Sequence, residues 1–243
     1  MCTVTFIPKG RDQFILTSNR DEQPSRSPQQ VTLTEQYGLH MIYPRDNGAG
    51  GTWIAASSDN RLVCLLNGAF EIHERKPPYK RSRGLMALDF FQYRHTCNFV
   101  DCYDFKDIEP FTMVIYDQGK LADFRWDGHQ KHLQLLDPAG FYMWSSATLF
   151  NDDARQRRQR WFEEWRRGRT DYSLEAILDF HANAGKEDSW NGLRMNRNGM
   201  VQTVSITSVV KTQGCVQMQY HDLLRDNLKK AQIQLKSEPA YSF

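Results

Sequence analysis

The chain has 243 residues, of which 40% are apolar and 25% charged, and its formal net charge is +2. These values are ordinary for a globular protein and predict one domain over residues 1–243. The charge balance is too even to indicate nucleic-acid binding, and no run of about eighteen apolar residues predicts a membrane span. The first residues lack the basic-then-apolar layout of an export signal, so we expect a cytoplasmic protein, with its oligomeric state left open.

The cysteines and histidines give no sign of a built-in metal. The five cysteines are an odd number at scattered spacings, which is typical of reduced thiols in the cytosol. None of the seven histidines stands in a metal-binding spacing such as HExxH, so no metal or cofactor is predicted. A single histidine can still ligate a haem iron, so haem stays open as a ligand.

Alternating apolar residues and turn signals predict many short strands and few helices. The predicted strands are 2–6, 14–18, 31–34, 40–43, 53–57, 61–66, 111–116, 121–126, 131–136, 141–145, 200–210 and 216–220. Helices are predicted from residue 82 or 84 to about 95, over 151–167 and over 173–182, and the tail after 222 is expected to add a short helix. This order, with strands mostly in hairpins, predicts an α+β domain.

Two loops are predicted beside the functional end of the chain. Residues 23–28 contain two prolines and cannot continue the strand before them. Residues 73–83 are basic and proline-bearing, and they also form a loop. Three glycines within residues 48–51 suit a backbone that needs positive φ or a close approach to another group.

Cys2 is the strongest candidate for chemistry. Once Met1 is removed, Cys2 carries a thiol and a free α-amine, and an amine with a pKa of about 7.7–8 can accept the thiol proton. If the first two strands pair, Arg20 and Asp21 return to the level of Cys2. There a guanidinium favours the thiolate and a carboxylate orients the amine.

Three motifs carry a resemblance to a known family: Met-Cys-Thr at 1–3, Ser-Asn-Arg-Asp-Glu at 18–22 and Gly-Gly-Thr-Trp at 50–53. With them the chain resembles the NRDE family, also called the transport and Golgi organisation 2 (TANGO2) family. That family is similar to the cysteine-type N-terminal nucleophile (Ntn) hydrolases, such as bile-salt hydrolases and penicillin V acylases. The resemblance covers most of the chain and implies a four-layer αββα sandwich of mostly antiparallel sheets.

The resemblance also implies partners for Cys2. Asp21 matches the carboxylate of the bile-salt type, whereas Arg20 is adjacent to it and the hydrolases have two residues between the pair. Asn67 ends an apolar strand and is the first candidate to stabilise the oxyanion of an acyl-transfer reaction, a contribution of about 3–4 kcal/mol.

Two positions depart from the hydrolase pattern. Ser146 stands where the hydrolases have a second asparagine near mid-chain, and Gln202 stands where they have an arginine in a late strand. Asn19, Thr52 and Trp53 complete the predicted binding set, with the glycine-rich segment as a possible cradle for an anion or a carbonyl. Since no GxGxxG or P-loop spacing is present, we do not expect a nucleotide.

Simpler structural roles stay open for these residues. Cys2 can be a small buried side chain, Arg20 can form a surface ion pair, and Trp53 can be a core residue. Asn67 with the following glycine can be an ordinary turn.

The arginine-rich segment 151–167 raises nucleic-acid binding as a further possibility. Its aromatic residues, Trp161, Phe162 and Trp165, are three and four positions apart, so we expect them to pack inward. Pairs four residues apart, such as Arg160 with Glu164, belong to a solvated face. We therefore do not expect nucleic acid as a partner.

The sequence thus predicts a hydrolase that cleaves a linear, non-peptide amide bond with Cys2 as the nucleophile. Its partner is a small-molecule amide or a hydrophobic ligand. The alternative is a non-catalytic protein that keeps the same fold and binds or traffics haem or acyl lipids, as the resemblance to eukaryotic relatives implies.

Overall fold

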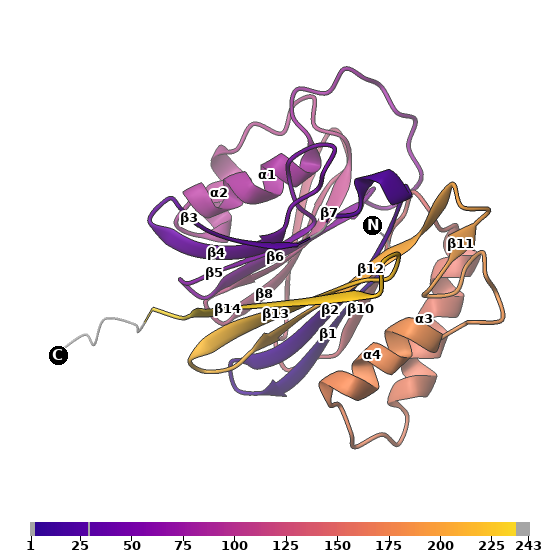
Figure 1. Ribbon diagram of the computed structural model, residues 1–243. Coiled ribbons are helices and arrows are strands. Elements are labelled where there is room, and N and C mark those ends of the chain that lie inside the picture. The colour runs from indigo at the N-terminus through magenta and orange to yellow at the C-terminus, as the bar shows by residue number, and fades with distance from the viewer. Residues whose placement is uncertain (1–2, 29, 237–243) are drawn as a thin grey trace.

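Two antiparallel sheets lie face to face, and a pair of helices covers the outer face of each (Figure 1). The structure is a computed structural model that describes residues 3–28 and 30–236. The predicted α+β class and the αββα order of layers are confirmed. Among the described residues, no helix combines the length and the apolar character needed to cross a membrane.

The first sheet contains both ends of the described chain. Its strand order is β10-β1-β2-β12-β13-β14, and β11 pairs with β12. In chain order these strands are β1 (Thr3–Gly10), β2 (Gln13–Glu22), β10 (Tyr142–Ser145), β11 (Asn196–Arg197), β12 (Val201–Lys211), β13 (Cys215–Asp222) and β14 (Asn227–Gln234). The N-terminal strand therefore lies in the interior of the sheet, between β10 and β2.

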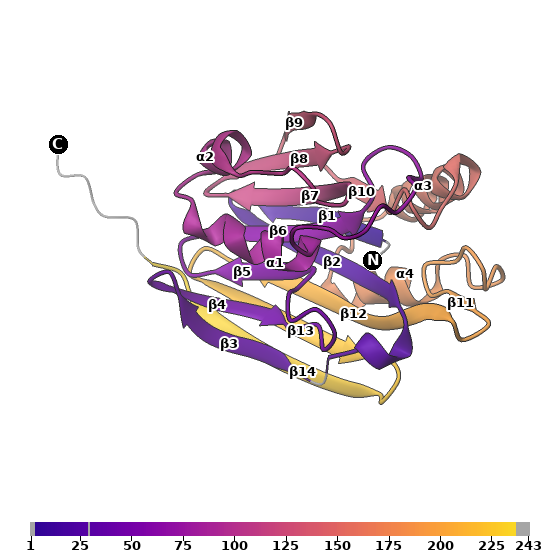
Figure 2. The same ribbon diagram turned by 90° about the horizontal axis from the view of Figure 1, so that it is seen from above.

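The second sheet is a meander in which each strand pairs with the next one along the chain. Its strands are β3 (Val31–Gln36), β4 (Leu39–Pro44), β5 (Ile54–Ser57), β6 (Arg61–Asn67), β7 (Phe111–Asp117), β8 (Lys120–Trp126) and β9 (Lys131–Leu136). Seen from above, the two sheets overlap along much of their width (Figure 2).

Side chains on alternate positions of β1 and β2 face two different layers. Val4 and Leu16 belong to the core between the sheets, whereas Ile7 and Ile15 pack against the helices α3 (Asp152–Arg166) and α4 (Leu174–Asn183). This alternation follows from strand geometry and decides which face each site residue occupies.

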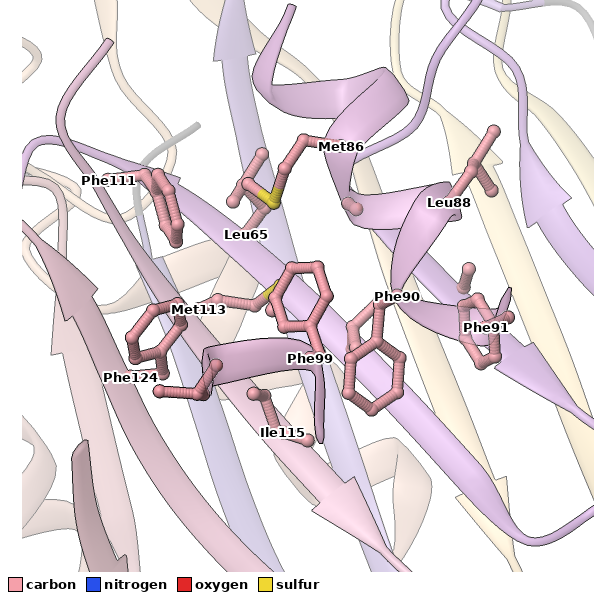
Figure 3. Close-up of a cluster of buried hydrophobic side chains, with 14 of the residues drawn as sticks. Leu65, Met86, Leu88, Phe90, Phe91, Phe99, Phe111, Met113, Ile115 and Phe124 are labelled. Carbon is pink, nitrogen blue, oxygen red and sulfur yellow. The ribbon is translucent and has the colours of Figure 1, made fainter. Parts of the chain in front are cut away.

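The outer face of the second sheet carries the helices α1 (Arg83–Asp89) and α2 (Thr96–Cys102). Met86 and Phe99 from these helices pack on Leu65, Met113 and Ile115 of the sheet (Figure 3). Because these residues are buried, the cluster anchors α1 and with it the loop that precedes the helix.

The helix predicted to run to about residue 95 ends earlier. After α1, a short 3-10 turn, η2 (Phe90–Gln92), leads to Tyr93 in an extended conformation. The guanidinium of Arg61 donates to the carbonyls of Phe91 and Tyr93, at 3.3 and 2.5 Å, and thereby satisfies acceptors that a continuing helix would have used. Helix α2, which follows, was not predicted.

The tail predicted to be a short helix is the strand β14 instead. Ala231 and Ile233 alternate along it, and Leu235 follows the strand; Ile233 is buried in the core between the sheets, and the other two are partly buried against it. A period of two residues is the pattern of a half-buried strand, so the sequence carried this signal. The remaining predicted strands and helices are confirmed, with shifts of a few residues at their ends. Residues 23–28 contain the short helix η1 (Pro24–Arg26).

A fully buried histidine ties α4 to the first sheet. The Asn19 amide donates to the carbonyls of His181 and Leu193, at 2.9 and 2.6 Å. Its oxygen therefore accepts from His181 Nδ1, at 2.7 Å, and His181 Nε2 accepts from the Thr5 hydroxyl, at 2.8 Å. Burial, together with repulsion from Arg158, lowers the pKa of His181 to about 3, so the ring is neutral.

This histidine makes stability depend on acid. Since its folded-state pKa of about 3 lies below the ordinary value of 6.5, the unfolded chain binds a proton more readily between these pH values. We therefore expect the free energy of unfolding to fall as the pH drops from 6.5 towards 3, by up to about 1.4 kcal/mol per pH unit from this group.

Urea unfolding at several pH values measures the effect. His181→Gln should show a shallower dependence on pH than the parent, whereas His129→Gln, at an exposed position, should keep the parent slope. Equal slopes in all three proteins would contradict the assignment.

Candidate functional site

Cys2 lies outside the described residues, so the site is built from its surroundings. Thr3 is the first described residue of β1, and it pairs with Asn19 of β2 on one side and Ser145 of β10 on the other. The strands that continue past these partners carry Arg20 and Asp21 on one side and lead to Ser146 on the other.

Arg20 is buried between the two sheets in an ion pair. Its guanidinium donates to the Asp46 carboxylate and, at 3.0 Å, to the carbonyl of Arg26. It also lies over the Trp53 ring, 4.1 Å from the ring centroid. Only 2% of the Arg20 surface is exposed, so a solvated surface ion pair does not describe it.

Asp46 shapes the glycine-rich segment beside Arg20. Its side chain accepts hydrogen bonds from the backbone N–H groups of Gly48 and Ala49, at 2.9 and 2.7 Å, and its carbonyl accepts from Gly50 N at 3.0 Å. Burial alone would raise the pKa of Asp46, but the Ala49 hydrogen bond and the charge of Arg20 outweigh it and hold that pKa below its usual value. These N–H groups are thus occupied within the protein, which leaves them unavailable as an anion or carbonyl cradle.

The rest of this segment packs tightly against α1. A Cβ at Gly51 would lie 2.3 Å from the Gly84 carbonyl carbon, so only glycine fits there. The Thr52 N–H donates to Gly84 O, at 3.1 Å, and its hydroxyl bonds to the Pro44 and Ile54 carbonyls, at 2.8 and 2.9 Å. The N–H and the hydroxyl of Thr52 are therefore both bonded to backbone carbonyls.

Asp21 and Asn19 lie on the opposite face of β2 from Arg20. Asp21 accepts a hydrogen bond from the Thr203 hydroxyl of β12, and Asn19 is enclosed by the contacts to His181 and Leu193 described above. Asn19 thus holds the helical layer in place, and Asp21 faces the same layer.

Asn67 and Ser146 meet at the end of β6. The Ser146 hydroxyl donates to the Asn67 carbonyl, at 2.8 Å, and also lies 3.2 Å from the Thr148 hydroxyl. The Gly68 N–H donates to the Pro110 carbonyl, at 3.0 Å. The hydroxyl and this N–H are therefore engaged, and Asn67 is the residue of this corner that lines a cavity.

That cavity, of about 300 Å³, opens between η1, the glycine-rich segment and the loop 68–82. It brings together four of the predicted site residues, namely Arg20, Thr52, Trp53 and Asn67. Asn19, Asp21, Ser146 and Gln202 do not line it. Gln202 is half-buried and pairs in the sheet with Glu22 and Asn196.

Two buried charged residues of this region were not singled out from the sequence. Asp46 is the partner of Arg20, and Arg158 of α3 is fully buried against the start of β1. Arg158 donates to the Thr3 hydroxyl and to the carbonyls of Asn191 and Gly192, and its guanidinium stacks 3.4 Å from the centroid of Phe150. The sequence showed the Asp-Asn-Gly turn signal at 46–48. It did not show that Asp46 pairs with Arg20 or that Arg158 contacts Thr3.

Other reactive groups in the described part of the chain lie elsewhere. Cys64 is enclosed in the core, where burial raises the pKa of its thiol to about 12. Cys97 and Cys102 are exposed on α2. No three His, Cys, Asp or Glu side chains among residues 3–28 and 30–236 gather as they would around a metal ion.

The family model described as Transport and Golgi organisation 2 matches residues 1–221. The chain belongs to this family. The resemblance drawn from the motifs at residues 1–3, 18–22 and 50–53 is thereby confirmed. No protein with a curated function matches the sequence.

Among the solved structures similar to this member of the Transport and Golgi organisation 2 family, two have the Ntn-hydrolase fold. An N-acylethanolamine-hydrolyzing acid amidase ortholog from Caenorhabditis elegans has a TM-score of 0.58 and 14% identity, over 86% of this chain and 92% of that one. A variant of conjugated bile acid hydrolase from Clostridium perfringens has a TM-score of 0.53 and 7% identity, over 100% and 99% of the two chains. At such low identity, these likenesses establish the fold alone.

The Arg20–Asp46 pair yields a stability prediction. Asp46→Ala should lower the free energy of unfolding by about 3–5 kcal/mol, because it leaves the buried Arg20 charge without its carboxylate. Asp46→Asn keeps an oxygen for the Gly48 and Ala49 N–H groups and should cost less. Urea denaturation measures both, with Asp101→Ala on the exposed side of α2 as a control; equal effects at positions 46 and 101 would contradict the prediction.

Proposed function

We propose that this protein is an N-terminal cysteine hydrolase that cleaves a linear, non-peptide amide bond after Met1 is removed. The observation that carries the proposal is the register of β1 and β2 at the edge of the cavity that Arg20 lines. Thr3 pairs with Asn19, so a further step along both strands leads to the level of Arg20, and the next step to that of Asp21.

The alternation of side chains along β1 supports different roles for Arg20 and Asp21. Val4 and Phe6 face the core between the sheets, and a strand places every second side chain on the same face. In this proposal the thiol of Cys2 acts on the side of Arg20 and Trp53, next to the cavity, and the Asp21 carboxylate orients its α-amine.

The chemistry that follows uses few groups. The thiol passes its proton to the α-amine, and sulfur attacks the amide carbonyl carbon. The resulting tetrahedral intermediate expels the amine, which takes the proton, and leaves a thioester on Cys2. Water, deprotonated by the α-amine, then cleaves the thioester, releases the acid and restores the thiol.

Asn67 is the donor proposed for the oxyanion of that intermediate. Its backbone is held from two sides, by the Ser146 hydroxyl on its carbonyl and by the sheet pairing with Phe111. A donor fixed in this way needs little reorganisation when charge develops. In this proposal Ser146 positions Asn67, and Gln202 has no contact with the reacting atoms.

One observation favours the second candidate, a non-catalytic protein that binds haem or an acyl lipid. The Ser146 hydroxyl is engaged with the Asn67 carbonyl, so the corner where the hydrolases have a second asparagine offers one side-chain donor to an oxyanion instead of two. The experiments below separate the two candidates.

Substitution of the nucleophile tests the proposal directly. Intact-mass spectrometry should show a chain without Met1, and a library of acyl amides should be hydrolysed by the parent. Cys2→Ala should abolish that hydrolysis, because no other thiol lines the cavity among the described residues. Cys97→Ala, on the exposed face of α2, serves as the matched control. A Cys2→Ala variant as active as the parent would overturn the proposal, and a chain that retains Met1 and hydrolyses no acyl amide would favour the binding protein.

The role of Asn67 has its own kinetic signature. Asn67→Ala should lower kcat by roughly 10²- to 10³-fold, with little change in KM, because the contact forms with the charged intermediate and not with the ground state. Asn98→Ala, on the surface of α2, controls for unspecific loss of an amide. A change in KM alone would assign Asn67 to ground-state binding.

A further inference from the structure

Arginine is the commonest charged residue in the lining of the cavity. In addition to Arg20, four arginines line it: Arg26, Arg75, Arg81 and Arg83. The acidic residues of the lining are Glu22, Asp46 and Glu109. The described part of the lining therefore holds five guanidinium groups and three carboxylates.

Two of these carboxylates each serve more than one cation. Glu109 accepts from Arg83 at 3.1 Å and from Arg75 at 3.4 Å, and it also contacts His73 at 3.3 Å. Asp46 is shared by Arg20 and Arg26, the latter at 3.0 Å.

Arg81 has its own partner, Asp89, at 2.5 Å, which stands outside the lining. With Asp89 included, five guanidinium groups face four carboxylates. One formal positive charge is left over around a small cavity.

The arginine side chains of the lining differ in how exposed they are. The side chain of Arg75 is 74% exposed and that of Arg81 is 41% exposed, and both come from the loop 68–82. The Arg83 side chain is only 14% exposed, and burial lowers the pKa of its guanidinium although Glu109 opposes the shift. A ligand entering past Arg75 thus meets cations in progressively drier surroundings, where each charge interaction is stronger.

Guanidinium groups match one ligand chemistry especially well. Their parallel N–H donors bind the paired oxygens of a carboxylate or phosphate, and a weakly hydrated cation gives up water for them at low cost. Glu109 is the partner that an incoming oxyanion can supplement, because this one carboxylate serves both Arg75 and Arg83. Arg26, by contrast, has Glu22 as a second partner, at 2.7 Å.

We propose that the ligand of this cavity is an acyl amide whose far end carries a carboxylate or phosphate, held by Arg75, Arg81 and Arg83. The proposal rests on the proposed function only in taking this cavity as the one that receives the substrate. Its test is a binding experiment, so its outcome does not depend on turnover.

Three probes with one acyl chain distinguish the ligand classes. N-octanoylglycine ends in a carboxylate, N-octanoylphosphoethanolamine ends in a phosphate, and N-octanoylethanolamine is neutral. Calorimetric titration of the Cys2→Ala chain, which cannot form the thioester, should show at least one anionic probe binding about tenfold or more tightly than the neutral one, a difference of about 1.4 kcal/mol. Comparison of the two anionic probes identifies the oxyanion. Equal affinity for all three probes, or a preference for the neutral one, would overturn the proposal.

Salt and substitution give independent readouts of the same contact. The preference for an anion should shrink as sodium chloride is raised from about 0.05 to about 0.5 M, since exposed charges become screened. It should also be lost in the double variant Arg75→Gln/Arg81→Gln, while Arg160→Gln on the exposed face of α3 keeps it. A preference unchanged by both salt and the double variant would place the anion elsewhere and overturn the assignment.

The failure of this proposal is distinguishable from that of the proposed function. If the parent protein hydrolyses only neutral amides, the proposed hydrolase activity is confirmed and the anionic substrate class is wrong. If anionic probes bind the Cys2→Ala chain but the Cys2 chain cleaves none of them, the binding site stands and the hydrolase falls.

Discussion

The buried ion pair between Arg20 and Asp46 is the interaction on which the site depends. It joins β2 of the first sheet to the glycine-rich segment that follows β4 of the second, and the same carboxylate gives that segment its shape. Neither charge could be buried alone, because the cost of removing an ion from water is several kcal/mol. The pair therefore sets the spacing of the sheets where the cavity opens, with Trp53 stacked beneath the guanidinium.

A second set of buried polar groups holds the other face of the same strands. Thr3, Thr5 and Asn19 point towards the helices and bond to Arg158 and His181. Each hydrogen bond satisfies a group that would otherwise be costly to enclose, so the helical layer is placed by geometry as well as by apolar contact. The first few residues of β1 are thus fixed from both sides.

Much of the fold followed from the sequence because its signals are local. Hairpin turns, alternating apolar residues and the capping residue Asn151 depend on neighbours a few positions away, and these elements were correctly predicted. The end of the first helix depends on Arg61, some thirty positions earlier in the chain, so no local signal marked it. The strand β14 was missed although the alternation of Ala231 and Ile233 was there to be read.

The site was only partly accessible from sequence for the same reason. Arg20, Trp53 and Asn67 were selected by motif and position, and they share the cavity. The partners Asp46 and Arg158 are ordinary charged residues until the fold brings them against Arg20 and Thr3. The faces of Asn19 and Asp21 could have been foreseen from the two-residue period of β2, given Arg20 as a reference.

The position of β1 has a consequence for how the protein is made. The strand is flanked by β2, which is local, and by β10, some 140 positions later, while β2 itself waits for β12 from the last quarter of the chain. Contacts so distant in sequence form late and slowly. A growing or truncated polypeptide that lacks β12 therefore leaves one side of β2 unpaired, and the first sheet is complete only after the last quarter of the chain has been synthesised and folded back.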